Sequence, residues 1–131
     1  MSPTYSWYSQ LIKPSFAPPS WIFGPVWSVL YIIIAVTFIR VFYLSATKVI
    51  PGIIVIPFIL NLIFNFSFTP LQFGLQNNYL AAIDILLVLG TLIWAIIAIW
   101  PYSRKLAYAQ IPYLLWVTFA TVLQLTITWM N

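Results

Sequence analysis

The chain of 131 residues fits a single domain and is 63% apolar but only 5% charged, against about 45–50% and about 25% in soluble chains. Six charged side chains could not cover a soluble protein of this size, whereas apolar runs of about 20 residues match a hydrocarbon core of roughly 30 Å. The sequence therefore predicts an integral membrane protein, and its lack of cysteine and histidine excludes disulfides and thiolate or imidazole ligation of a metal or haem.

Residues 1–20 form an arm that is rich in aromatic residues and proline, including Trp7, Lys13-Pro14 and Pro18-Pro19. Prolines at this density disfavour a helix and favour extended or turn structure. The arm also lacks the basic region followed by an apolar run that is typical of a signal peptide. Because it is too aromatic for a free tail, we expect it to lie at the membrane surface or to fold back over the helix ends.

After the arm, the sequence predicts an all-α membrane protein that is a bundle of four transmembrane helices. The predicted helices cover approximately residues 21–43, 51–68, 79–100 and 106–129. Prolines punctuate them: Pro25 lies near the start of the first, Pro57 is expected to kink the second, and Pro101 stops the third. Pro112 falls inside the fourth. Tryptophans and tyrosines gather near the predicted ends, where amphipathic rings prefer to sit in a membrane.

The charges lie at segment ends, so the net charge of +4 indicates topology rather than nucleic-acid binding. With four spans, Lys13 shares its side with the second connection and the C-terminus. Arg40, Lys48, Arg104 and Lys105 lie on the other side. The excess of positive charge there predicts that the first and third connections are cytoplasmic and that both termini are outside.

Several dense motifs are distributed along the chain. They comprise Trp7-Tyr8, Leu11, Lys13-Pro14, Phe16, Pro18-Pro19, Trp21, Phe23-Gly24-Pro25-Val26-Trp27, Leu30-Tyr31, Leu60-Asn61-Leu62, Ala82-Ile83-Asp84-Ile85-Leu86, Pro112-Tyr113, Trp116-Val117 and Phe119-Ala120. In these positions the chain resembles the TspO/MBR family of tryptophan-rich sensory or translocator proteins. The resemblance covers essentially the whole chain.

The resemblance implies a five-helix fold, of which the four predicted helices correspond to helices 2–5. In the family the Trp7 motif follows the first helix, and only six residues precede Trp7 here. We therefore expect the first family helix to be absent from this chain. The resemblance also implies that the arm is a lid over a ligand cavity. The lid residues would be Trp7, Lys13, Pro14, Pro18 and Pro19, and without the tether of a first helix we expect the lid to be looser.

Two groups of side chains are candidates for that cavity. Trp27 and Tyr31 are i, i+4 neighbours on one helix, and the resemblance implies that Trp27 belongs to the cavity. Trp116, Ala120 and Gln124 form an i, i+4, i+8 stripe on the last helix, where a small residue between two large ones leaves room beside a ring. Both groups could equally serve helix packing.

Polar residues inside the predicted spans form a third group of candidates. Asn61 and Asn65 share a face, and intramembrane polar side chains usually face the protein interior and hydrogen-bond there. We expect Asn61 to be the better ligand candidate and Asn65 the better interhelical clamp. Asp84 lies about one turn into the third helix, where the helix dipole favours its charge. A structural pairing with Lys13 is favoured over a ligand role.

The chain lacks the parts of the usual hydrolytic and metal chemistries, and we expect no obligatory cofactor and no metal site. Aromatic rings with a few amides suit a flat hydrophobic ligand. The leading hypothesis is a TspO-like membrane protein that binds a tetrapyrrole such as protoporphyrin, as a sensor or carrier. One alternative is light-dependent porphyrin degradation, with Trp27 and Trp116 as reactive residues by resemblance.

A second alternative is an accessory structural subunit of a larger, pigment-bearing membrane complex, which would use the groove left by the missing helix. The expected surroundings are the lipid bilayer of a bacterial inner or photosynthetic membrane. The expected partners are a hydrophobic small molecule and either further copies of the chain or a larger membrane complex, with no nucleic acid.

Overall fold

The computed structural model describes residues 15, 20–71, 75 and 77–130, and every regular element in that part of the chain is helical. The elements are η1 (Ser20–Ile22), α2 (Phe23–Ala46), η2 (Gly52–Ile54), α3 (Val55–Thr69), α4 (Asn78–Ile99), α5 (Arg104–Ala109) and α6 (Ile111–Met130). The predicted all-α membrane bundle is thereby confirmed. The predicted lid residues Trp7, Lys13, Pro14, Pro18 and Pro19 lie outside the described residues.

Three segments are long and apolar enough to cross a membrane: Gly24–Ala46, Asn78–Ile99 and Arg104–Met130. The fourth, Gly52–Phe68, is a shorter apolar helix of about 25 Å, near the lower limit for a span. The outer faces of the helices are themselves apolar, with Ile39, Ile97 and Leu115 largely exposed. Such a surface would be a liability in water and is stable in lipid, so the chain is an integral membrane protein.

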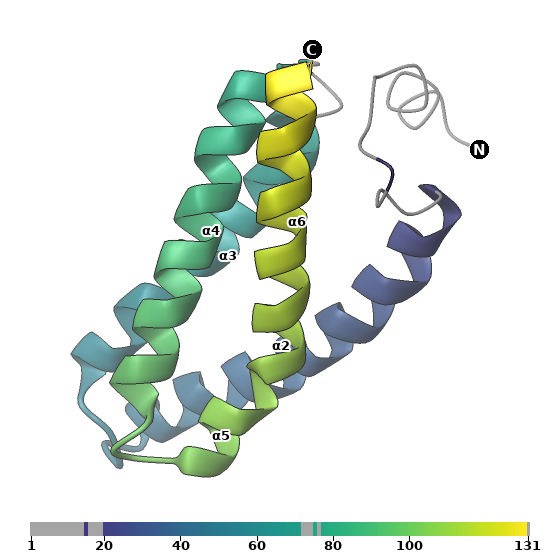
Figure 1. Cartoon of the computed structure of the whole chain (residues 1–131). Helices are drawn as coiled ribbons and strands as arrows, with labels where there is room; N and C mark the ends of the chain where they lie inside the picture. Colours follow the sequence, from purple (N-terminus) through teal and green to yellow (C-terminus); the bar gives the residue numbers. More distant parts are fainter. Residues whose placement is uncertain (1–14, 16–19, 72–74, 76, 131) are drawn as a thin grey trace.

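Helix α4 packs against both α3, which lies behind it in Figure 1, and α6, which lies beside it. Ala81 and Ala95 of α4 are fully buried, and small residues allow neighbouring helices to approach closely in membranes. Helix α6 runs antiparallel to α4, so the end of α6 lies beside the start of α4 (Figure 1). These three helices form the compact part of the bundle.

Helix α2 packs against this compact part mainly through its C-terminal half. Phe38 of α2 and Phe58 of α3 meet edge to face with ring centroids 4.9 Å apart, and Val41 is fully buried. Towards its N-terminal end α2 diverges from α6 (Figure 1). The aromatic side chains at that end of α2 therefore lie along the open side of the bundle.

The single helix expected over 106–129 is interrupted near its start. The Gln110 N–H donates to the Ala107 carbonyl (3.1 Å), which closes α5, and the Leu114 N–H donates to the Gln110 carbonyl (2.8 Å), which opens α6. Pro112 explains the break, because proline has no N–H and its ring clashes with the carbonyl four residues earlier. The chain nevertheless continues as one apolar span, and Pro112 sits in the first turn of α6, where proline is tolerated.

Candidate functional site

Tyr113 is the centre of a buried polar network between α3 and α6. Its side chain is fully buried, and its hydroxyl donates to the Asn61 Oδ1 (2.9 Å) and accepts from the Asn65 Nδ2 (2.6 Å). The two asparagines are one turn apart on α3, so both reach the same face of α6. A tyrosine hydroxyl can both donate and accept a hydrogen bond, and the Tyr113 hydroxyl does both here.

The network extends from Tyr113 to α4 and α2. The Asn61 Nδ2 donates to the Val88 carbonyl (3.0 Å) and to the Thr91 Oγ1 (3.2 Å) on α4. The Tyr31 hydroxyl of α2 donates to the Asn65 Oδ1 (3.2 Å). Four helices are thus joined by one set of hydrogen bonds in a region where lipid offers polar groups no other partner.

The two asparagines differ in how available they are to a ligand. Asn61 is fully buried, and its amide oxygen and nitrogen are engaged by α6 and α4. This arrangement favours the clamp role for Asn61. Asn65 is also buried, but its oxygen is held by Tyr31, whose side chain is 39% exposed. The route from the outside of the bundle to the network therefore leads through Tyr31 and Asn65.

Aromatic rings surround the outer end of this network. The Trp27 ring lies 5.5 Å from the Tyr31 ring and meets the Tyr113 ring edge to face at 6.4 Å. The Phe66 ring lies 6.2 Å from Tyr31 and is 60% exposed. We call Trp27, Tyr31, Phe66 and Tyr113 the aromatic cluster. It runs from the bundle interior to the exposed edge between α2 and α3.

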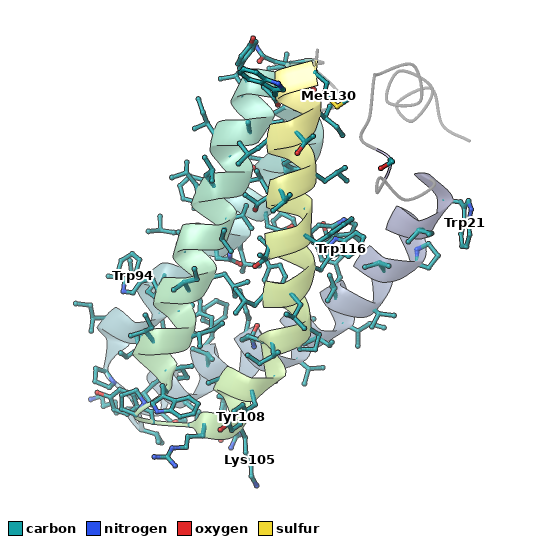
Figure 2. All side chains as sticks on the ribbon, in the orientation of Figure 1. Trp21, Trp94, Lys105, Tyr108, Trp116 and Met130 are labelled. Atoms are coloured by element: carbon teal, nitrogen blue, oxygen red, sulfur yellow. The ribbon has the colours of Figure 1, made fainter. Side chains whose placement is uncertain are left out.

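Trp116 and Ala120 lie on α6 next to the aromatic cluster. Figure 2 shows Trp116 on the side of α6 that faces α2, and its ring lies 5.5 Å from the Phe119 ring. Trp116 and Ala120 are both partly buried. They continue the α6 wall beyond Tyr113, so the structure brings them to the same side of the bundle as Trp27.

Gln124 lies away from the aromatic cluster, although it shares a stripe with Trp116 and Ala120. Its Nε2 donates to the Asn78 carbonyl at the start of α4 (3.4 Å) and to the Thr128 Oγ1 (3.2 Å). Gln124 follows Tyr113 by about 16 Å along the axis of α6. Its contacts are those of a clamp between α4 and α6.

Asp84 is buried in α4, with 4% of its surface exposed, and its Oδ2 has no hydrogen-bond partner among the described residues. The expected pairing with Lys13 concerns a residue outside the described part of the chain. Asp84 is the only acidic side chain of the protein. Among the described residues, the polar contacts of the aromatic cluster are hydrogen bonds between neutral hydroxyls and amides.

Sequence reasoning did not single out Tyr113 or Thr91 as site residues. A signal was present for Tyr113: it falls inside an apolar span, whereas tyrosines of membrane proteins concentrate at the interfaces. A hydroxyl at that depth needs a partner within the protein. The two asparagines one turn apart on another helix are suitable partners.

Comparison with known protein sequences shows the family of the chain. The sequence profile of the TspO/MBR family matches residues 1–130. The chain is 38% identical to tryptophan-rich protein TspO of Bacillus cereus over 96% of its own length and 81% of that protein. It is 34% identical to the human translocator protein (89% and 70%) and 30% identical to the tryptophan-rich sensory protein of Cereibacter sphaeroides (88% and 70%). The chain therefore belongs to the TspO/MBR family.

Proposed function

We propose that this protein binds a flat hydrophobic ligand against the aromatic cluster, and that a tetrapyrrole such as protoporphyrin is the preferred ligand class. One observation carries the proposal: the rings of Trp27, Tyr31 and Phe66 form a continuous path from the exposed edge of the bundle to the buried hydroxyl of Tyr113. A flat ring system gains wide contact with such side chains, and a few polar groups suffice to orient it.

The chemistry of the chain favours a metal-free ligand. Haem proteins hold their iron through histidine, cysteine, methionine or tyrosine, and the chain contains neither of the first two. Ring contacts do not depend on a metal, since dispersion and quadrupole interactions act on the macrocycle itself. The Tyr31 hydroxyl and the Asn65 amide, at the outer end of the network, are the nearest groups that could form hydrogen bonds to polar substituents of the ligand.

The cellular role that we propose is that of a sensor or carrier of the ligand. The names of two relatives describe a sensory protein and a translocator protein. A carrier or sensor needs reversible binding, and a site built from rings and neutral amides provides contact without covalent chemistry. Phe66 is 60% exposed and lies in the apolar helix Gly52–Phe68, so we propose that a hydrophobic ligand arrives at this edge from the lipid.

Titration of the purified protein with protoporphyrin tests the ligand. The chain has seven tryptophans, so binding is expected to quench the intrinsic fluorescence in a saturable manner at micromolar porphyrin. Empty micelles and the protein unfolded in SDS are the controls for partition of the porphyrin into detergent. Quenching that rises linearly without saturation, equal in folded and unfolded samples, would overturn the proposal.

We also propose that the end of the bundle that carries α5 is cytoplasmic. Arg40, Lys48, Arg104 and Lys105 lie towards this end, and cytoplasmic connections of membrane proteins are enriched in positive charge. Because the chain has no cysteine, Ser103→Cys introduces a unique thiol there. In intact cells this thiol is expected to resist a membrane-impermeant maleimide and to react after lysis. Equal labelling before and after lysis would reverse the orientation.

A further inference from the structure

One end of the bundle carries most of the positive charge of the protein. Arg40 near the end of α2, Lys48 after it, and Arg104 and Lys105 at the start of α5 are all exposed. We call these four side chains the basic rim. They are four of the five cations of the chain. Figure 2 shows Lys105 projecting away from the bundle at this end.

The protein has no acidic side chain that could neutralise the basic rim. Its single carboxylate side chain, Asp84, is buried in the first half of α4. From there to Trp100, at the end of that helix, is about 24 Å along the axis, far beyond the roughly 4 Å separation of an ion pair. The counter-charges of the basic rim must therefore come from outside the chain.

Aromatic rings hold the two arginines of the basic rim. The Arg104 guanidinium carbon lies 5.2 Å from the centre of the Trp100 ring, which itself meets the Tyr108 ring edge to face at 5.3 Å. The Arg40 guanidinium carbon lies 5.5 Å from the centre of the Tyr43 ring. A guanidinium that lies on a ring still has N–H donors free to bind an anion. The planar fork of the guanidinium matches the geometry of phosphate oxygens.

We propose that the basic rim binds the phosphodiester headgroups of anionic phospholipids in the adjacent leaflet, with Arg104 on Trp100 as the most ordered contact. Tryptophan and tyrosine rings prefer the headgroup level of a bilayer, so Trp100 and Tyr108 place the guanidinium at the depth of the phosphates. The lipid supplies the negative charge that the chain lacks. The basic rim lies at the opposite end of the bundle from Trp27, which is near the start of α2. This inference therefore stands independently of the porphyrin proposal.

Native mass spectrometry of the protein with an equal mixture of phosphatidylglycerol and phosphatidylcholine of identical acyl chains tests the proposal. The wild-type protein is expected to retain phosphatidylglycerol preferentially. Each basic residue near an anionic surface strengthens binding about fivefold. The preference of the double variant Arg104→Gln/Lys105→Gln for phosphatidylglycerol is therefore expected to be about 25-fold smaller than that of the wild type. Arg104→Lys keeps the charge but not the planar fork, and its preference is expected to be at least twofold smaller.

Lys13→Gln is the matched control, because it removes one positive charge that does not belong to the basic rim. It is expected to keep the wild-type preference. An unchanged preference in the double variant would overturn the proposal. The single variant Arg104→Gln removes the same charge as Lys13→Gln. An equal loss of preference in these two single variants would also overturn the proposal, since net charge alone would then explain the effect. Arg104→Lys, which preserves charge and size, provides the test if the double variant does not fold.

Discussion

Replacing Asn61 by leucine is expected to lower the free energy of unfolding by about 2–4 kcal/mol. Leucine has a similar volume, so the change removes hydrogen bonds without opening a large cavity. Three are lost: those to the Tyr113 hydroxyl, the Val88 carbonyl and the Thr91 hydroxyl. Hydrogen bonds between membrane helices contribute about 0.6–1.7 kcal/mol each, and a buried hydroxyl left without an acceptor adds about 1–3 kcal/mol.

The measurement is unfolding by SDS in mixed micelles, followed by circular dichroism. Two conservative variants grade the effect. Tyr113→Phe removes two bonds of the network, and Tyr31→Phe removes the one that Tyr31 donates to Asn65 at the partly exposed edge. The expected order of loss is Asn61→Leu, then Tyr113→Phe, then Tyr31→Phe. If Tyr31→Phe destabilised the protein as much as Asn61→Leu, the buried network would not be the main clamp of the bundle.

Replacing Trp27 by leucine is expected to weaken protoporphyrin binding about 10- to 100-fold. Trp27 is the ring that contacts both Tyr31 and Tyr113, so its loss removes the centre of the aromatic cluster. Stacking of an aromatic side chain on a planar base contributes about 1–3 kcal/mol, and 1.4 kcal/mol corresponds to a factor of ten in the dissociation constant. Trp116→Leu, in the adjoining wall of α6, is expected to have a smaller effect.

Trp94→Leu is the matched control for the binding experiment. Trp94 is 45% exposed and projects from α4 on the side of the bundle away from α2 (Figure 2). The Trp94→Leu variant loses one indole from the fluorescence signal, as Trp27→Leu does, but it keeps the whole aromatic cluster. The affinity of this variant for protoporphyrin is therefore expected to equal that of the wild type. Equal affinities of Trp27→Leu and Trp94→Leu would place the porphyrin elsewhere on the protein. Circular dichroism of both variants checks that the helices are retained.

Features that depend on neighbours in the sequence could be predicted from the sequence. Apolar length and composition predicted helices at residues 21–43 and 79–100, close to the observed α2 (Phe23–Ala46) and α4 (Asn78–Ile99). The spacing of Asn61 and Asn65 predicted a shared polar face, and both are buried and hydrogen-bonded. Helical periodicity is a local property, so it can be recognised without the fold.

Features that depend on which helix faces which could not be predicted in this way. Tyr113 meets Asn65 and Asn61 across sequence separations of 48 and 52 residues, a pairing that no local pattern encodes. Trp116 and Gln124 share a stripe on α6, yet Trp116 lies on the side of α2 and Gln124 bonds to Asn78 of α4.

The sequence by itself determined that this protein is a membrane bundle of apolar helices with four of its five cations towards one end and a few amides inside. It could do so because transfer into lipid depends on the length and polarity of each segment alone. Only the tertiary structure decided that Tyr113 is the meeting point of the amides and that Trp27, Tyr31 and Phe66 lead to it. Helix packing made that choice, since buried polar groups in lipid must find their partners on whichever helix lies opposite.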